Sequence, residues 1–206
     1  VKKSSQNYDL SSYLILPVQR LGRYELLLKR VIECTPKSHP DAQNLESAVQ
    51  KVAEVNRQIN SFIKADENRL KIVGLVKRFA VPPSPPLDKE GRLLVREGEA
   101  VWVNRGEKVN SKTKPSHIAL FDDVILICKI TKESRLEKRL MVDLSEKTHV
   151  MEPADGDDHK ELSLLLDSGN GMVFLLVFGK KLEKKQWKQK LGEVLSAVSL
   201  RKELDT

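Results

Sequence analysis

The residues of this sequence best suited to binding chemistry are two arginines in an apolar, helix-like segment at 14–31. Arg23 and Arg30 are separated by two helical turns, so a helix places both on one side, roughly opposite Leu21 and Leu28. A guanidinium on that exposed side can form paired hydrogen bonds with carboxylates or carbonyls of a partner. A helix face that meets only water has the same pattern, and the residues alone leave both interpretations open.

Two asparagines in a second helical pattern are the next candidates. Apolar residues recur with a 3.6-residue period from Leu45 to Ile63, which predicts a helix. Asn60 falls at the edge of this apolar stripe, and Asn56 falls nearer its centre. An amide both donates and accepts hydrogen bonds, so either residue could bridge neighbouring helices or bind a partner.

Residues 1–79, which carry these candidates, are helical in pattern. Pro17 suits the first turn of a helix over 17–33, where its missing N–H would be unpaired anyway. A second helix follows the loop after Pro36 and continues towards Phe79.

The rest of the chain changes pattern twice. Residues 80–88 contain four prolines, which favour stiff, extended backbone and predict a linker. Residues 89–206 predict several short strands followed by an amphipathic helix at 182–198 that carries Trp187. We therefore expect an α+β multidomain chain in which a bent sheet or barrel is capped by the C-terminal helix.

Composition narrows the function classes. The 206 residues are 40% hydrophobic and 32% charged, as in ordinary globular proteins. No apolar run approaches the ~20 residues that span a bilayer, and the N-terminus lacks a signal-peptide core. The net charge of +7 suits anionic lipid or an acidic protein, whereas 5% aromatic residues do not indicate base stacking. We expect a cytoplasmic location, recruitment to the membrane surface and no nucleic-acid partner.

Covalent and metal chemistry have no recognisable motif. The sequence has no glycine-rich phosphate loop, nucleophile elbow or zinc-protease motif. Cys34 and Cys128 lie far apart, and we expect both to be buried and unreactive. The four histidines are scattered, so we interpret them as surface or turn residues. No cofactor and no metal are expected.

The segment LILPVQRLGRYELLLKRV at 14–31 closely resembles the most recognisable helix of the Dbl-homology domain. This domain is the catalytic module of guanine nucleotide exchange factors for Rho-family GTPases. The resemblance implies that the basic residue before the motif's tyrosine, here Arg23, contacts the switch regions of the GTPase. It also implies that Asn60 hydrogen-bonds the second switch, with Asn56 as the competing candidate. Glu25 departs from the family, which often has proline there.

The mechanism that this resemblance implies makes no covalent bond. An exchange factor of this family binds the nucleotide-free GTPase better than the nucleotide-bound form, and by linkage it lowers nucleotide affinity. It does so by reshaping the switch segments that hold Mg²⁺ and phosphate, which promotes GDP release.

The second part resembles the pleckstrin-homology domain that habitually follows. The matching segments are REGEAVWVN at 96–104, HIALFDDVILICK at 117–129 and the helix tryptophan Trp187. The resemblance implies a phosphoinositide site on basic residues of the first strands and their loop, here Arg105, Lys108, Lys112, Lys114 and Lys129. The stricter phosphoinositide pattern is absent, since Pro115 and Ser116 follow Lys114, so weak attachment or protein binding is an equal alternative.

The domain boundaries that follow are 1–79 for the C-terminal helices of a Dbl-homology domain, 80–88 for the linker and 89–206 for the pleckstrin-homology domain. The family's further clamp is a glutamate on an earlier helix, which we do not find before Leu10. We therefore expect a fragment with little exchange activity alone, whose uncovered helices self-associate as a homo-oligomer. The alternative is a non-catalytic pleckstrin-type module that binds membrane or protein.

Overall fold

The computed structural model describes residues 10–104, 114–154 and 160–204 of the chain. Contacts divide the chain into two compact units, Val1–Glu67 and Asn68–Thr206. We call the first the helical unit and the second the sheet unit, and each is described by itself. Our expected fold class, helices followed by a mostly antiparallel β domain and a final helix, is confirmed.

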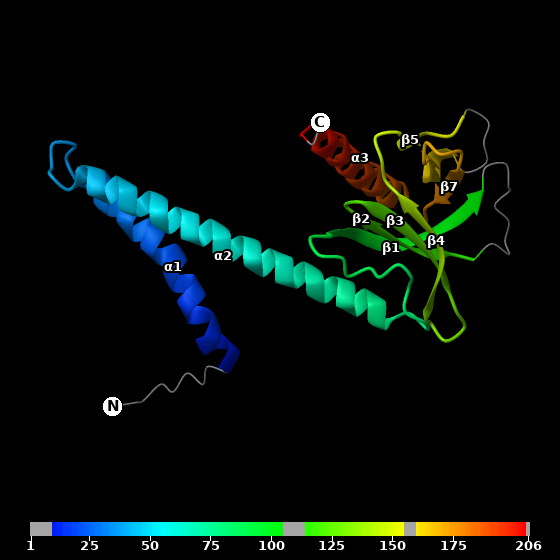
Figure 1. Ribbon diagram of the computed structural model, residues 1–206, viewed down its shortest axis with the longest axis horizontal. Coiled ribbons are helices and arrows are strands. Elements are labelled where there is room, and N and C mark those ends of the chain that lie inside the picture. Colours follow the sequence, from blue (N-terminus) through cyan, green and yellow to red (C-terminus); the bar gives the residue numbers. More distant parts are fainter. Residues whose placement is uncertain (1–9, 105–113, 155–159, 205–206) are drawn as a thin grey trace. The chain divides into compact units, whose positions relative to one another are not determined.

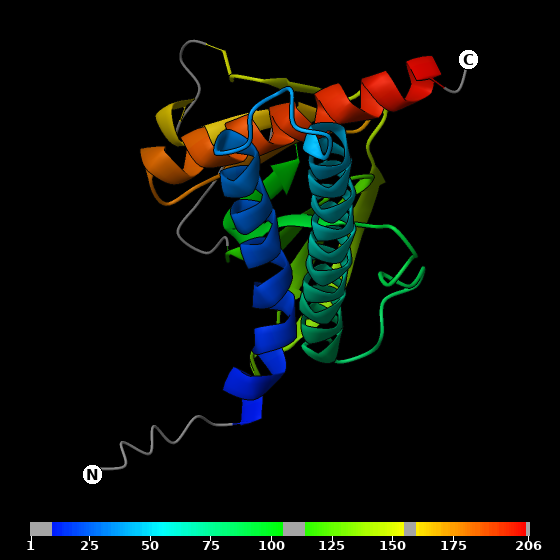
Figure 2. The ribbon, with the colours of Figure 1, turned by 90° about the vertical axis from the view of Figure 1, so that its left-hand side faces the viewer.

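The helical unit is an antiparallel hairpin of α1 (Leu10–Glu33) and the first part of α2 (Ala42–Lys77). Figures 1 and 2 show α1 folded back beside α2. The chain leaves α1 at Cys34, whose N–H bonds the Arg30 and Val31 carbonyls at 3.3 and 3.2 Å. Pro36 then prevents helical angles at Thr35. The α2 helix begins where the Leu45 N–H bonds the Asp41 carbonyl at 2.9 Å.

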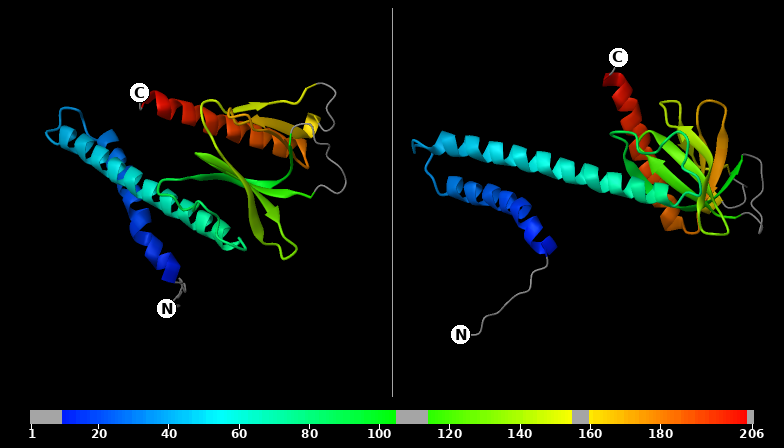
Figure 3. Two further views of the ribbon diagram at one scale, coloured as in Figure 1. Left: turned by 45° about the vertical axis from the view of Figure 1, so that its right-hand side comes forward. Right: turned by 60° about the horizontal axis from the view of Figure 1, so that its bottom comes forward.

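Our placement of Pro17 at a helix start is wrong, because α1 begins seven residues earlier and contains Pro17 in its interior. A proline inside a helix has no N–H for the preceding turn, and its ring clashes with that turn, so the helix bends there. Figure 3 shows α1 bent in its N-terminal half. After the bend Leu21, Leu28 and Ile32 are half-buried, whereas Leu14 before it is exposed.

The sheet unit is built on a seven-stranded antiparallel sheet in the order β4-β3-β2-β1-β7-β6-β5. Its strands are β1 (Leu94–Asn104), β2 (Ser116–Phe121), β3 (Val124–Ile130), β4 (Leu136–Asp143), β5 (His149–Met151), β6 (Ser163–Asp167) and β7 (Val173–Val177). A short 3₁₀ turn, η1 (Lys160–Leu162), precedes β6, and α3 (Lys181–Leu204) ends the described chain. The first half of β1 pairs with β2 and its last four residues pair with β7, so β1 belongs to both layers of the bent sheet.

Both faces of β2 and β3 are buried, which explains their uninterrupted apolar runs. Alternate residues such as Ile118 and Ile127 join a core that α3 closes with Trp187 and Leu191 (Figure 1). The residues between them, such as Leu126, join a second core beneath the end of α2 and the 79–87 segment. The final helix therefore caps one core, while the second is closed by the segment that precedes the sheet.

The proline-rich segment 80–88 lies within the sheet unit rather than between the two units. Pro83 and Leu87 are buried, and the Lys138 ammonium donates to the Ser84 carbonyl. Just before this segment, the Ala80 N–H bonds the Leu136 carbonyl at 3.0 Å. Our 1–79, 80–88 and 89–206 boundaries stay a prediction.

The two cysteines differ. Burial raises the pKa of the Cys128 thiol to about 12, so this residue is unreactive. Cys34 is exposed, so our expectation that it is buried is wrong: it lies directly after α1, where none of the described residues of the helical unit buries it. In the described part of the chain, the helices are too short or too polar to cross a bilayer.

Candidate functional site

The predicted binding residues of the helical unit lie on the outer sides of α1 and α2. Arg23 is exposed on α1, on the side away from the half-buried Leu21 and Leu28. Beside it the Arg20 guanidinium stacks over the Tyr24 ring, with 5.7 Å between the guanidinium carbon and the ring centroid. This contact stays within α1, so it leaves the Arg23 guanidinium facing solvent with its fixed fork of donors.

The two candidate asparagines of α2 have different surroundings. The Asn56 amide is half-buried and donates to the Glu25 carboxylate at 2.7 Å and to the Leu21 carbonyl at 3.4 Å, both on α1. Asn60, one turn further on, is exposed. Among residues 10–104, 114–154 and 160–204 no side-chain hydrogen bond of Asn60 is found. Asn56 therefore forms its hydrogen bonds within the hairpin, whereas the donors and acceptor of the exposed Asn60 amide are accessible to a partner.

The sequence did not predict that Glu25 forms a hydrogen bond between the two helices. Lys29 donates to its Oε1 at 2.7 Å and Asn56 donates to its Oε2 at 2.7 Å. These two hydrogen bonds, that of Lys29 first, hold the pKa of the Glu25 carboxyl below its usual value. The i,i+4 spacing of Glu25 and Lys29 could have been found in the sequence, but the bond to Asn56 depends on how the hairpin aligns.

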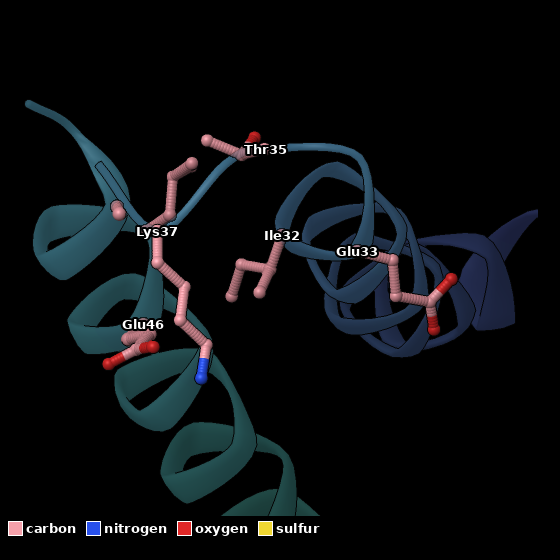
Figure 4. Close-up of a pocket in the computed structure, with 7 residues that line it drawn as sticks. Ile32, Glu33, Thr35, Lys37 and Glu46 are labelled. Atoms are coloured by element: carbon pink, nitrogen blue, oxygen red, sulfur yellow. The ribbon is translucent and has the colours of Figure 1, made fainter. Parts of the chain in front are cut away.

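The structure does not bring Arg23 and Asn60 into contact, and each presents its own exposed side chain. Two hollows flank this region of the helical unit. One of about 500 Å³ lies along the bend of α1, lined by Tyr13, Leu16, Pro17, Arg20, Leu21 and Tyr24. The other, of about 270 Å³, lies at the turn between the helices and includes Ile32, Lys37 and Glu46 (Figure 4). Neither contains Arg23 or Asn60.

The expected lipid-binding residues are only partly described. Arg105, Lys108 and Lys112 lie outside the described residues. Lys114 is exposed just before β2. Lys129 near the end of β3 pairs with Glu137 at 3.7 Å, so part of its charge is already offset.

A polar cluster that the sequence did not reveal lies where α2 ends. The His117 side chain is 5% exposed in β2, so our interpretation of it as a surface or turn residue is wrong. Its Nε2 lies 3.1 Å from the Glu97 carboxylate, and its Nδ1 lies 3.5 Å from an Arg78 nitrogen. Arg78 also donates to Glu97 at 3.0 Å. Burial first, then the Arg78 charge, lowers the pKa of His117.

A second buried link joins the start of the sheet to its first hairpin. The Arg92 guanidinium bonds both Asp123 oxygens, with distances of 2.8 to 3.1 Å, and it also donates to the Pro86 and Leu87 carbonyls. The Asn68 amide binds the Arg92 carbonyl and the Leu94 N–H, each at 2.8 Å. Among the described residues, no group of three or more histidine, cysteine or acidic side chains could hold a metal ion.

Comparison with known proteins shows what the helical unit is similar to. Residues 1–60 match the RhoGEF domain. The resemblance to Rho-family exchange factors is confirmed. The RhoGEF match covers α1, the first part of α2 and both Arg23 and Asn60. The roles of these two residues stay predictions.

Among curated proteins, the chain is 26% identical over 191 residues to a Rac guanine nucleotide exchange factor JJ of Dictyostelium discoideum. That alignment covers 92% of this chain and 16% of the relative. A Rac guanine nucleotide exchange factor B of the same organism is 39% identical over 121 residues, which is 59% of this chain and 10% of the relative. The chain thus spans a small part of the length of the relatives it matches.

Solved structures confirm the two-part fold. The linker-DH/PH domains of p115-RhoGEF match with a TM-score of 0.71 at 22% identity, over 92% of this chain and 57% of that one. A DH/PH fragment of PDZRHOGEF, solved in complex with human RhoA, matches with a TM-score of 0.62 at 21% identity, over 92% of this chain and 56% of that one. At this identity the likeness establishes the fold alone, which is a helical part followed by a bent sheet with a C-terminal helix, as in those DH/PH structures.

Proposed function

We propose that this chain supplies part of the GTPase-binding surface of a guanine nucleotide exchange factor for Rho-family small GTPases. The observation that carries the proposal is the RhoGEF match over residues 1–60, which includes the exposed Arg23 and Asn60. Two relatives of this chain carry exchange-factor names, and a DH/PH fragment of similar fold was solved in complex with RhoA.

In the proposed mechanism, Arg23 and Asn60 act as clamps on the switch segments of the GTPase. The Arg23 guanidinium donates to carboxylates or carbonyls of one segment. The Asn60 amide donates and accepts, so it can replace backbone hydrogen bonds that a switch segment loses when it moves. Contacts made better with the nucleotide-free GTPase lower the affinity for GDP by the same factor, because binding linkage is reciprocal.

The direct test is the affinity of the chain for a panel of Rho-family GTPases in nucleotide-free, GDP-loaded and GTP-analogue-loaded forms. We expect preferential binding to a nucleotide-free form. Arg23→Ala and Asn60→Ala should each weaken it about tenfold, the loss expected for one charge-assisted or buried hydrogen bond. Arg30→Ala and Asn44→Ala remove the same two types of side chain from other exposed positions of α1 and α2, and these variants should bind normally. Equal affinity for all nucleotide states would contradict the proposal.

A second proposal concerns the membrane. We propose weak electrostatic attachment of a cytoplasmic protein to anionic lipid through the +7 charge, with Lys114 as one contributor and Lys129 as a smaller one because of Glu137. Each cation near an anionic surface contributes about 1 kcal/mol. Sedimentation with vesicles of phosphatidylcholine, with and without phosphatidylserine or phosphoinositide, tests it. Binding that does not depend on anionic lipid would reject it.

A third proposal is self-association of the helical unit. Leu26, Leu27 and Phe62 are more than half exposed, and exposed apolar surface tends to find a partner. We propose that two copies pack these helices together. Sedimentation equilibrium should give a mass that rises with concentration, and Leu27→Glu should lower the association. A monomer at all concentrations would contradict this.

A further inference from the structure

The Glu25–Asn56 hydrogen bond joins α1 to α2 beside the two proposed GTPase contacts. Glu25 follows Arg23 by two residues, and Asn56 precedes Asn60 by one turn. At 1.5 Å of rise per residue, the bond lies about 3 Å along α1 from one contact and about 6 Å along α2 from the other. This position lets the bond set the separation of the two contacts.

We propose that Glu25 and Asn56 form a brace that positions Arg23 and Asn60 for the GTPase, with Asn56 a positioning residue rather than a contact. The inference rests on the proposed function, since the brace matters to binding only if both contacts meet one partner. It also assigns separate roles to the two asparagines that the sequence left in competition.

The other contacts between α1 and α2 do not fix how the two helices align. The residues that α1 turns towards α2 include Leu21, Leu28 and Ile32, and those of α2 include Ala48 and Val52, all only half-buried. Apolar contacts of this kind tolerate sliding and rotation, because burial is non-directional. A hydrogen bond to a carboxylate has a fixed length and direction, so it selects one alignment.

The charge of Glu25 makes the brace effective. Lys29 bonds one carboxylate oxygen and Asn56 bonds the other, so both oxygens have a donor. The Leu21 carbonyl, one turn earlier on α1, accepts from the same Asn56 amide at 3.4 Å.

The test exchanges donor and acceptor across the bond. Asn56→Asp places two carboxylates in contact, and because like charges repel it should separate the helices at this point and weaken binding to the nucleotide-free GTPase about tenfold. Glu25→Gln alone keeps an acceptor for Asn56 and should cost about threefold or less. The double variant Glu25→Gln with Asn56→Asp restores a hydrogen bond between the helices with its direction reversed, because the amide is now on α1 and the carboxylate on α2.

We expect the double variant to recover affinity to within about threefold of the wild type, a rescue that a general loss of helix stability would not produce. Lys29→Ala is the matched control, because it removes a partner of Glu25 but leaves the bond between the helices. Circular dichroism checks that all variants keep their helix content. Normal binding by Asn56→Asp, or no recovery in the double variant, would overturn the proposal.

A second readout separates the brace from the proposed function. Nitroxide labels at Leu26→Cys and Gln50→Cys, in a Cys34→Ser background, report the spacing of α1 and α2 by pulsed electron resonance without any GTPase. We expect Asn56→Asp to broaden the distance distribution and the double variant to narrow it again. An unchanged distribution would refute the brace, whereas a wild type that shows no nucleotide-dependent binding would refute the proposed function and leave this spacing result standing.

Discussion

The helical unit leaves its apolar side chains exposed or half-buried, whereas the sheet unit buries many of its own completely. Among the described side chains of residues 10–67 none is buried, and Leu26, Leu27 and Phe62 are 69%, 61% and 74% exposed. In the sheet unit, β2, β3 and α3 supply side chains that are fully buried. The two helices of the hairpin can cover only one stripe of each other, whereas the sheet is covered on both faces. The sheet unit therefore has its own core, and the helical unit is a surface suited to partners.

The largest expected change in stability comes from comparing two leucine substitutions, one in each unit. Leu191 on α3 is fully buried, so Leu191→Ala should cost about 2–5 kcal/mol through lost burial and a cavity. Leu27 on α1 is 61% exposed in the single chain, so at concentrations too low for self-association Leu27→Ala should change stability by less than about 0.5 kcal/mol. Both tryptophans, Trp102 and Trp187, belong to the sheet unit, so their fluorescence during urea unfolding follows that unit.

Far-ultraviolet circular dichroism, recorded on the same samples, follows the helices of both units. A Leu27→Ala cost close to that of Leu191→Ala would mean that the helical unit has a core after all, for instance in a self-associated form. That result would remove the contrast between the two units.

Two ion pairs, one in each unit, allow the same comparison between a buried and an exposed side chain, because their nitrogen–oxygen distances are nearly equal. Arg92 binds Asp123 at 2.8 Å with 7% of its side chain exposed, and Arg30 binds Glu33 at 2.7 Å with 75% exposed. Arg92→Ala should cost about 3 kcal/mol, the lower end for a broken buried pair because Asp123 is partly exposed. Arg30→Ala should cost about 0–0.5 kcal/mol. Equal losses in urea unfolding would show that burial does not separate the two pairs.

The sequence predicted the elements whose pattern is local. The uninterrupted apolar runs of β2 and β3, and the 3.6-residue period of α2 and α3, led to strands and helices that the structure contains. The three-residue β5 was too short to give a pattern. Pro17 was misplaced, because a proline in a helix interior is rarer than one at a helix start, so the residue type alone favoured a start where the structure has the interior of α1.

The features that could not be predicted from the sequence depend on contacts between residues far apart in the chain. The Glu25–Asn56 bond spans 31 positions, and the burial of Pro83 and Leu87 depends on the strands that follow them. His117 looked like a surface residue because the covering of β2 by the end of α2 is a tertiary feature. Arg23 and Asn60 came from the resemblance to a family, since an exposed arginine or amide carries no signal of its own.

A smaller effect should appear in the sheet unit when the pH falls from 7.5 to 5.5. The pKa of the buried His117 lies below its usual value of 6.5, mainly because of burial and then because of Arg78, with Glu97 and Glu99 acting in the opposite direction. Between the two pKa values the unfolded chain binds more protons than the folded one, so the free energy of unfolding falls as the pH drops.

Urea unfolding followed by tryptophan fluorescence between pH 7.5 and 5.5 measures this loss. His117→Gln removes the imidazole at this position, so the stability of the variant should depend less on pH than that of the wild type. Equal slopes for the two proteins would mean that His117 takes up its proton as easily in the folded as in the unfolded chain.

The smallest effect compares one glycine from each unit. Gly22 in α1 and Gly74 in α2 lie inside helices, and an added methyl group at either position would meet no atom within 4 Å beyond the adjacent backbone of its own helix. Alanine is favoured over glycine in a helix by about 0.5–1 kcal/mol. Gly74→Ala should therefore raise the melting temperature seen by tryptophan fluorescence by about 2–4 °C. Gly22→Ala should increase the helical signal without moving that transition, because Gly22 lies outside the sheet unit; an equal shift from both would mean that the two units unfold together.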